Sequence, residues 1–185
     1  MISKVIAILL FIVLCPIFIS VSIISLLSNG SPILFKQKRV GKMGRVFIMY
    51  KFRSMKKNTP SEIPTHLLKN PKQHNTFIGS FIRKYSIDEL PQLLNIMKGD
   101  MKFIGARPSL LNQHDLNQLR IKLGTINSLP GITGWAQVNG RDNNTIIQKA
   151  EMELFYEENK SLYLDLKILV LTVKSMLLPK GVYPD

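Results

Sequence analysis

An apolar stretch without a charge, Val5 to Leu27, constrains the fold of this chain most strongly. These 23 residues contain no charged side chain. A straight helix of this length would measure about 34 Å, enough to cross a bilayer core of roughly 30 Å. A cleaved signal peptide is the alternative, but its apolar region runs only about 7–15 residues and ends at a small-residue cleavage site. No such site follows here, so the sequence predicts an N-terminal membrane helix.

The pair Cys15-Pro16 lies in the middle of this stretch. Proline has no amide hydrogen and its ring clashes with the carbonyl four residues earlier, so it bends or breaks a helix. Ser20 and Ser22 are candidate hydrogen-bond donors to the carbonyl that the proline frees. Two shapes stay open: a kinked helix that spans the bilayer, and a re-entrant helix that leaves by the face it entered, which would make the protein monotopic.

A strongly basic segment follows the apolar stretch. Nine lysines and arginines and no acidic residue lie between Lys36 and Lys57. Short basic segments beside a membrane helix stay in the cytoplasm, and each cation near anionic lipid headgroups gains about 1 kcal/mol. We therefore expect a body on the cytoplasmic face with anionic membrane lipids as partners. Few aromatic residues alternate with the basic ones, so nucleic acid is not an expected partner.

The rest of the chain predicts an α+β fold that is mostly helical with a small β-hairpin. We expect residues 1–31 to form the N-terminal membrane helix and residues 32–185 a cytoplasmic catalytic domain. Residues 33–38 and 46–52 are strand-like and joined by a glycine-containing turn at 41–44. A polar loop is expected over 58–75 and a glycine-rich loop over 129–141. The expected helices cover 77–85, 88–97, 110–123, 146–159 (with glutamates on its polar side) and 161–178 (a core or interfacial helix).

Two adjacent carboxylates, Asp88 and Glu89, stand out because no acidic residue precedes Glu62. They have a structural interpretation: Ser86 or Asp88 caps a helix, with Glu89 completing a capping box with Ser86. They also have a chemical one. A carboxylate can attack phosphorus to form an acyl phosphate, and its neighbour can hold Mg²⁺. Arginines such as Arg83 and Arg107 could then clamp phosphate oxygens.

Six blocks in order, covering nearly the whole chain, give a more specific signal. The chain resembles the bacterial sugar transferase family of monotopic polyprenyl-phosphate phosphoglycosyl transferases. The blocks that carry the resemblance are Phe35–Gly41, Tyr50–Met55, Ser86–Gln92, Lys98–Met101, Gly105–Pro108 and Pro130–Arg141.

The resemblance implies an enzyme that moves a sugar-1-phosphate from a UDP-sugar to undecaprenyl phosphate and releases UMP, the first membrane step of bacterial glycoconjugate synthesis. Asp88 matches the nucleophile that forms a covalent phospho-sugar intermediate, and Glu89 matches the carboxylate associated with Mg²⁺. Arg83 and Arg107 match positions near the nucleotide and its phosphates. Three further basic residues in family blocks are assigned to substrate or lipid phosphate: Lys51, Arg53 and Arg141.

The resemblance also implies a re-entrant helix broken at a serine-proline pair, which is Cys15-Pro16 here. It implies the cytoplasmic face of the bacterial inner membrane and a minimal catalytic version of the family. Two other functions are weighed: a membrane-anchored glycosyltransferase that transfers sugar only and releases UDP, and a non-catalytic basic membrane adaptor. The identity of the UDP-sugar, the pathway and the presence of a homo-oligomer are left open by the sequence.

Overall fold

The apolar N-terminal stretch folds as two helices with a sharp bend between them. The computed structural model describes residues 2–60, 63, 68, 70–140 and 144–177. Helices α1 (Ile2–Val13) and α2 (Cys15–Asn29) meet at an angle of 62°. Within the described residues no single helix is both long and apolar enough to cross a membrane, whereas this bent pair together has the required length and composition.

Pro16 explains where the bend falls. It occupies the first turn of α2, where its missing amide hydrogen breaks no helical bond. The Ser20 hydroxyl donates to the Pro16 carbonyl oxygen at 2.9 Å. The carbonyl that Pro16 leaves without its helical partner is that of Ile12, four residues earlier. The Ser20 hydroxyl therefore does not bind the freed carbonyl, as had been predicted, but the Pro16 carbonyl one turn later. The break predicted at Cys15-Pro16 is confirmed.

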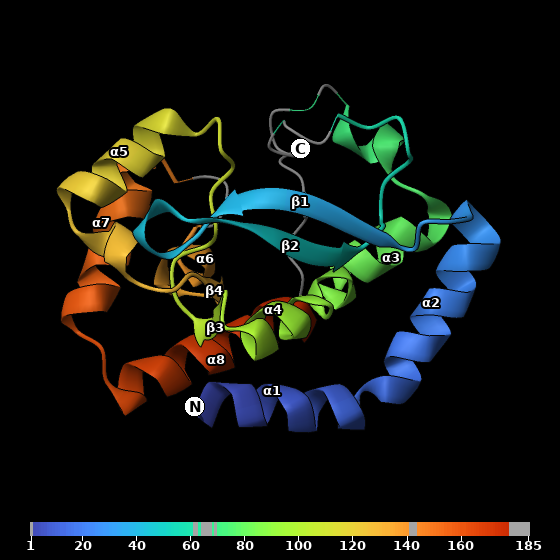
Figure 1. Cartoon of the computed structure of the whole chain (residues 1–185), viewed down its shortest axis with the longest axis horizontal. Coiled ribbons are helices and arrows are strands. Elements are labelled where there is room, and N and C mark those ends of the chain that lie inside the picture. Colours follow the sequence, from blue (N-terminus) through green and yellow to red (C-terminus); the bar gives the residue numbers. More distant parts are fainter. Residues whose placement is uncertain (1, 61–62, 64–67, 69, 141–143, 178–185) are drawn as a thin grey trace. The chain divides into compact units, whose positions relative to one another are not determined.

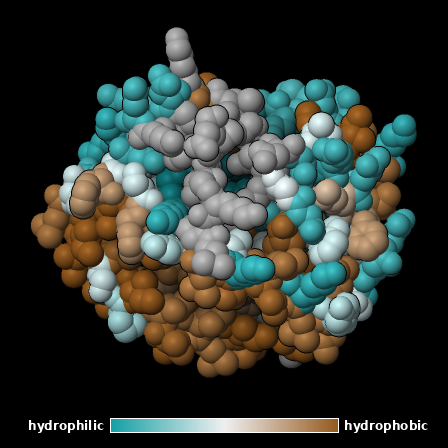
Figure 2. Space-filling model, turned by 180° about the vertical axis from the view of Figure 1, so that it is seen from behind, coloured by the Kyte–Doolittle hydropathy of each residue, from teal (hydrophilic) through white to brown (hydrophobic). Residues whose placement is uncertain are grey.

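Both N-terminal helices keep apolar side chains on their outer faces. Ile2, Val13 and Leu27 are 77%, 72% and 82% exposed. Figure 2 shows broad apolar areas on the surface of the molecule. Apolar surface of this extent is unusual for a protein that is surrounded by water alone and marks a membrane or protein contact.

The chain folds as two compact units, each made of separate segments. Unit 1 comprises Met1–Gln37, Met49–Lys98 and Met176–Asp185, and unit 2 comprises Lys38–Ile48 and Gly99–Ser175. Strands β1 (Leu34–Val40) and β2 (Val46–Phe52) pair as a hairpin (Figure 1), and each strand has residues in both units. The predicted boundary between residues 31 and 32 separates membrane from cytoplasm and stays a prediction.

Unit 1 is built on helices. Its core contains Val21 of α2, Phe52 of β2 and Ile82 of α3, with Ile87 and Leu90 packed against them. Helix α1 packs on α4 and helix α2 on α3. The N-terminal helices are therefore part of the core that supports the Asp88 segment. The remaining elements of the unit are η3 (Pro71–His74), α3 (Phe77–Lys84), η4 (Ile87–Glu89) and α4 (Gln92–Lys98).

Unit 2 contains a second small sheet that depends on close backbone contact. Strands β3 (Lys102–Ile104) and β4 (Gly131–Thr133) pair in parallel, with Lys102 opposite Gly131. A side chain at Gly131 would place its Cβ 2.1 Å from the Gly105 nitrogen. The other elements are η1 (Lys42–Gly44), α5 (His114–Lys122), η5 (Thr125–Asn127), α6 (Trp135–Val138), α7 (Ile146–Glu158) and α8 (Leu162–Leu177).

Helix α8 is amphipathic. Leu164 and Ile168 are buried in a core with Ile104 and Tyr156, whereas Leu162 and Val170 on the opposite side are 76% and 66% exposed. One face thus belongs to the core, and the other presents apolar surface, in keeping with the two roles considered for this helix.

The mostly helical α+β fold with a small hairpin is confirmed, with local corrections. The expected helix over 110–123 begins only at His114, and the Leu110 amide before it donates to the Gln113 side chain at 2.9 Å. The expected loop over 129–141 contains β4 and α6, and β3 was not predicted. The helix expected from Asp88 begins at Gln92.

Candidate active site

Asp88 lies in a tight turn rather than at the start of a helix. The 3₁₀ turn η4 covers Ile87–Glu89 and follows Ser86, whose backbone is left-handed at φ 56° and ψ 21°. Among the described residues, the Ser86 side chain makes no capping bond, so the predicted capping box of Ser86 and Glu89 is wrong, whereas capping by Asp88 stays a prediction. A serine with positive φ is uncommon and strained, and such residues cluster at functional sites.

The turn holds the Asp88 side chain in a buried position. Asp88 is only 6% exposed, and its neighbours Ile87 and Leu90 pack against the core of unit 1. A carboxylate removed from water in this way loses solvation that the protein must replace with other groups. The role of this buried carboxylate as a nucleophile stays a prediction.

Glu89 pairs with Lys51 of β2. The Lys51 Nζ lies 2.6 Å from the Glu89 Oε1, and the two side chains are 14% and 18% exposed. The adjacent amide of Tyr50 donates to the Asn95 Oδ1 at 3.1 Å, which fixes β2 against α4. Two of the predicted site residues are therefore in contact, and the strand that carries Lys51 is anchored to the helix that follows the Asp88 turn.

Two buried nitrogen atoms in this unit find no acceptor within the described residues. One is the Nε of Arg83, in the last turn of α3, and the other is the Nε2 of Gln92, a side chain that is 1% exposed. Arg83 makes one long bond, from its Nη1 to the Ser54 Oγ at 3.4 Å. Buried donors are almost always satisfied, so an anionic ligand is a suitable acceptor here. Gln92 was not among the predicted site residues.

Asp88 and Glu89 are the carboxylates to consider as ligands of Mg²⁺. Within the described part of the chain, no group of three or more His, Cys, Asp or Glu side chains is placed to hold a metal. Mg²⁺ is usually bound through one or two protein carboxylates, with water and substrate phosphate completing its shell. Glu89, the carboxylate predicted to hold Mg²⁺, is paired with Lys51.

Arg53 and Arg107 have other surroundings. The Arg53 Nε, in unit 1, donates to the Pro32 carbonyl at 2.9 Å. Arg107 belongs to unit 2, where its carbonyl accepts from the Arg120 Nη2 at 2.9 Å. Arg141, the last of the predicted basic residues, lies outside the described residues.

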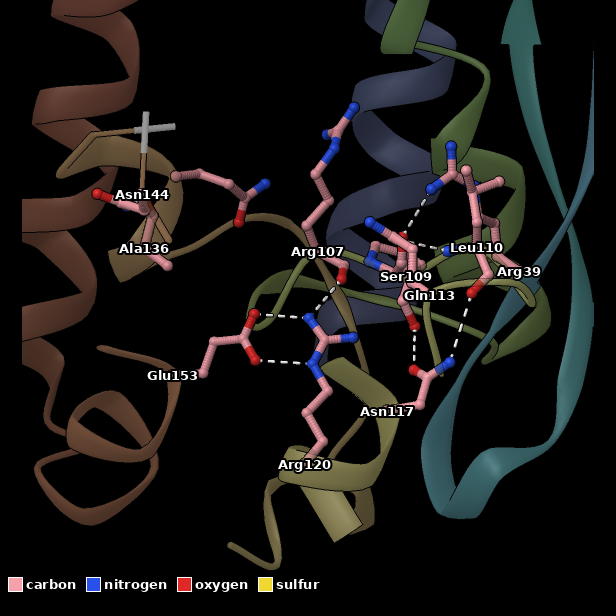
Figure 3. A network of polar contacts seen from close by, with 12 residues as sticks. Arg39, Arg107, Ser109, Leu110, Gln113, Asn117, Arg120, Ala136, Asn144 and Glu153 are labelled. Carbon is pink, nitrogen blue, oxygen red and sulfur yellow. Dashed lines mark hydrogen bonds and ion pairs between the residues drawn. The ribbon is translucent and has the colours of Figure 1, made fainter. Parts of the chain in front are cut away.

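Arg120 forms a buried ion pair that the sequence did not reveal. Its Nε lies 2.7 Å from the Glu153 Oε2 and its Nη2 lies 2.6 Å from the Glu153 Oε1 (Figure 3). Both residues are 4% exposed. The prediction that Glu153 lies on the polar face of its helix is therefore wrong. No local pattern marks this pair, because its members lie 33 residues apart.

Unit 1 thus contains a buried carboxylate, a second carboxylate paired with a lysine and, within the part of the chain that the structure describes, two buried donors without an acceptor. Residues 1–179 match the family described as bacterial sugar transferase. The chain is 44% identical over 157 residues to the uncharacterized sugar transferase EpsL of Bacillus subtilis, covering 84% of this chain and 75% of EpsL.

Two further relatives have names that state a reaction. A UDP-glucose:undecaprenyl-phosphate glucose-1-phosphate transferase of Xanthomonas campestris is 34% identical, over 98% of this chain and 39% of the relative. A UDP-N-acetylgalactosamine-undecaprenyl-phosphate N-acetylgalactosaminephosphotransferase of Aeromonas hydrophila is 36% identical, over 88% of this chain and 39% of the relative. The chain spans well under half the length of these two proteins.

The chain belongs to the bacterial sugar transferase family, a family of membrane enzymes. The resemblance predicted from the six sequence blocks is confirmed. Relatives named as sugar-1-phosphate transferases bear out the predicted reaction class, with UDP-sugars as donors and undecaprenyl phosphate as acceptor.

Proposed function

We propose that this protein transfers a sugar-1-phosphate from a UDP-sugar to undecaprenyl phosphate through a covalent intermediate on Asp88. The observation that carries the proposal is the buried Asp88 carboxylate in its strained turn, beside the Glu89–Lys51 pair. Family membership supports the reaction class, and the relatives' names supply the donor and acceptor.

The reaction has two displacements at one phosphorus atom. A carboxylate oxygen of Asp88 attacks the phosphorus bonded to the sugar, and the bond from that phosphorus to the bridging oxygen breaks. UMP leaves with the bridging oxygen, and the sugar-1-phosphate is held as an acyl phosphate. A phosphate oxygen of undecaprenyl phosphate then attacks the same phosphorus, which regenerates the Asp88 carboxylate and yields the diphosphate-linked lipid sugar. Such a scheme predicts ping-pong kinetics.

The basic residues have separate tasks in this scheme. Arg83, whose Nε is buried without an acceptor among the described residues, would bind a phosphate oxygen of the donor. Arg107, Arg53 and Arg141 are assigned to donor or lipid phosphate. Lys51 contacts Glu89 directly, so it also sets the position and charge of that carboxylate. Glu89 would hold Mg²⁺, which when bound offsets charge on the diphosphate.

The N-terminal helices suit a protein that enters and leaves the membrane on one face. Their 62° bend and exposed apolar side chains support re-entry, and the basic segment after them supports a site on the cytoplasmic face of the bacterial inner membrane. A site at headgroup level would give both the soluble donor and the lipid acceptor access to Asp88. Anionic lipids would help to hold the basic surface there.

The decisive experiment is intact-protein mass spectrometry after incubation with donor alone. The full chain in detergent micelles is mixed with Mg²⁺ and, separately, UDP-glucose, UDP-galactose and their N-acetylamino counterparts. One donor should add the mass of a sugar-1-phosphate, minus water, and release UMP. The adduct should be absent in Asp88→Asn and present in Asp115→Asn, which makes the same change at an exposed position. Substantial turnover by Asp88→Asn would refute the nucleophile assignment.

The same assay separates the alternatives. A glycosyltransferase that moves only the sugar would release UDP and carry no phospho-sugar adduct. A non-catalytic adaptor would release neither nucleotide, and its binding to anionic vesicles would be unaffected by Asp88→Asn or Glu89→Gln.

A further inference from the structure

We propose that Arg120, held by Glu153, is a positioning residue for Arg107, and that its contact with the Arg107 backbone sets the affinity of the enzyme for its donor. This inference rests on the proposed function, because it assumes that Arg107 binds donor phosphate. It concerns unit 2 alone, and it assigns a role to two residues that lie outside the six sequence blocks.

The segment that carries Arg107 is held at three successive carbonyl groups. The Arg107 oxygen accepts from the Arg120 Nη2 at 2.9 Å, the Pro108 oxygen from the Arg39 Nη1 at 2.9 Å, and the Ser109 oxygen from the Val40 amide at 3.0 Å. Hydrogen bonds at every residue leave an irregular segment little freedom. The backbone of Arg107 is therefore fixed in a way that an ordinary surface turn is not.

Of the three residues that donate to these carbonyl groups, Arg120 is the buried one. Its Nη2 bridges the Glu153 carboxylate and the Arg107 carbonyl, and its Nε makes the second bond to Glu153 (Figure 3). Two parallel bonds between a guanidinium and a carboxylate fix the plane of both groups. The third bond then transmits this fixed geometry to the main chain of Arg107.

The direction of the Arg107 side chain completes the argument. Figure 3 shows its guanidinium extending away from the Arg120–Glu153 pair while its carbonyl oxygen faces Arg120. The two ends of the residue thus point in different directions: the carbonyl oxygen is bound by Arg120, and the side chain points away from that bond. A flexible side chain on a fixed backbone loses less freedom when it binds an anion, and a misplacement of about 1 Å can cost up to a hundredfold in rate.

A purely structural pair would make different demands. Burying two charges is costly, and an apolar pair of similar volume often stabilises a core equally well or better. The bond from Arg120 to a carbonyl would have no equivalent in such a pair. A substitution that breaks the bond from Arg120 to the Arg107 carbonyl should therefore lower the activity while the folding stability stays nearly the same.

The test is a double-mutant cycle on the full chain in detergent micelles. Arg120→Lys keeps a cation for Glu153 but has a single nitrogen in place of the planar fork. It should lower kcat/KM for the donor about tenfold, mainly through KM, with little change in Tm. In the Arg107→Ala background the same substitution should change kcat/KM less than twofold, because nothing is left to position. Arg45→Lys, at an exposed arginine of the same unit, is the matched control.

Each other outcome overturns the inference. Equal losses for Arg120→Lys in both backgrounds would mean that Arg120 acts without Arg107, and wild-type kcat/KM in Arg120→Lys would mean that the contact is idle. If Arg107→Ala itself left donor kinetics unchanged, the inference would fail while the Asp88 adduct could still form. Should Arg120→Lys not fold, the paired change Arg120→Met with Glu153→Leu, which leaves no buried charge alone, is used in the same cycle.

Discussion

Replacing Gly131 by alanine tests the close backbone contact on which the second sheet depends. The new Cβ would lie 2.1 Å from the Gly105 nitrogen, and both partners are main chain, so neither can rotate away. An ordinary contact of about 3.4 Å requires the two segments to separate by about 1.3 Å. The Gly131 amide bond to Ala106 and the Gly105 amide bond to Thr133, both 2.8 Å long, would then exceed hydrogen-bonding distance.

These losses set the size of the effect. Two backbone hydrogen bonds contribute about 1 kcal/mol each, and overpacking costs a further 1–3 kcal/mol, so Gly131→Ala should destabilise unit 2 by roughly 3–5 kcal/mol. Thermal unfolding in detergent, followed by circular dichroism, should show a Tm lowered by roughly 10 °C. Donor kcat/KM should fall as well, because Ala106 precedes Arg107 and would move with the broken bond.

Gly124→Ala is the matched control within the same unit. Among the described residues nothing lies within 4 Å of a Cβ at Gly124, but its φ is +74°, which favours glycine. Alanine there should cost only about 1 kcal/mol, through backbone conformation alone. A Gly131→Ala protein that is as stable as the wild type, or more stable than Gly124→Ala, would refute the account of the sheet.

Three further predictions concern other parts of the chain. Because Ser86 is left-handed, Ser86→Gly should be tolerated and Ser86→Val should lower Tm; the reverse order would contradict the turn geometry. Burial alone would raise the pKa of Glu157, but hydrogen bonds from Lys160 and a serine hold it below its ordinary 4.5. The stability that ionised Glu157 contributes is therefore complete above pH 4.5 and is lost as the pH falls through the lowered pKa. In Glu157→Gln the free energy of unfolding should depend less steeply on pH over that acid range. The same pH dependence in the variant and the wild type would show that Glu157 does not contribute. Asn95→Ala should leave the Tyr50 amide unpaired, cost about 1–3 kcal/mol and speed hydrogen exchange in β2, which unaltered exchange would disprove.

Features set by neighbouring residues were predictable from the sequence. The break at Cys15-Pro16 follows from the proline ring itself, and the hairpin follows from two strand-like runs around a glycine turn. The helix expected over 161–178 is observed as Leu162–Leu177. In each case the information lies within a few positions of the feature, so no tertiary contact is needed to find it.

Features that depend on distant contacts were not predictable. The three-residue strands β3 and β4 carry no side-chain alternation, and they pair because Gly131 lets two backbones approach. The sequence predicts Glu153 as a surface residue, because other glutamates surround it. Its burial depends on the ion pair with Arg120, which only the fold forms. The left-handed serine before Asp88 had no sequence signal, since serine rarely adopts that conformation.

The site was predictable in part. The contact between Lys51 and Glu89 joins a strand and a turn 38 positions apart. The adjacent acidic pair marked Glu89 as a candidate, but only the resemblance to a family placed Lys51 among the candidates. The roles of Asp88, Glu89 and the arginines stay predictions until the adduct and its variants are measured.

The buried pair of Arg120 and Glu153 also restricts how this chain can diverge. Loss of either partner alone leaves an uncompensated charge in the interior, at a cost of about 3–5 kcal/mol that few domains tolerate. A change that removes the charge at one position is therefore viable only together with a change that removes the charge at the other. In sequences that descend from this one we expect the two positions to covary. A substitution at one of them should be tolerated where the other has already changed and should be deleterious where it has not.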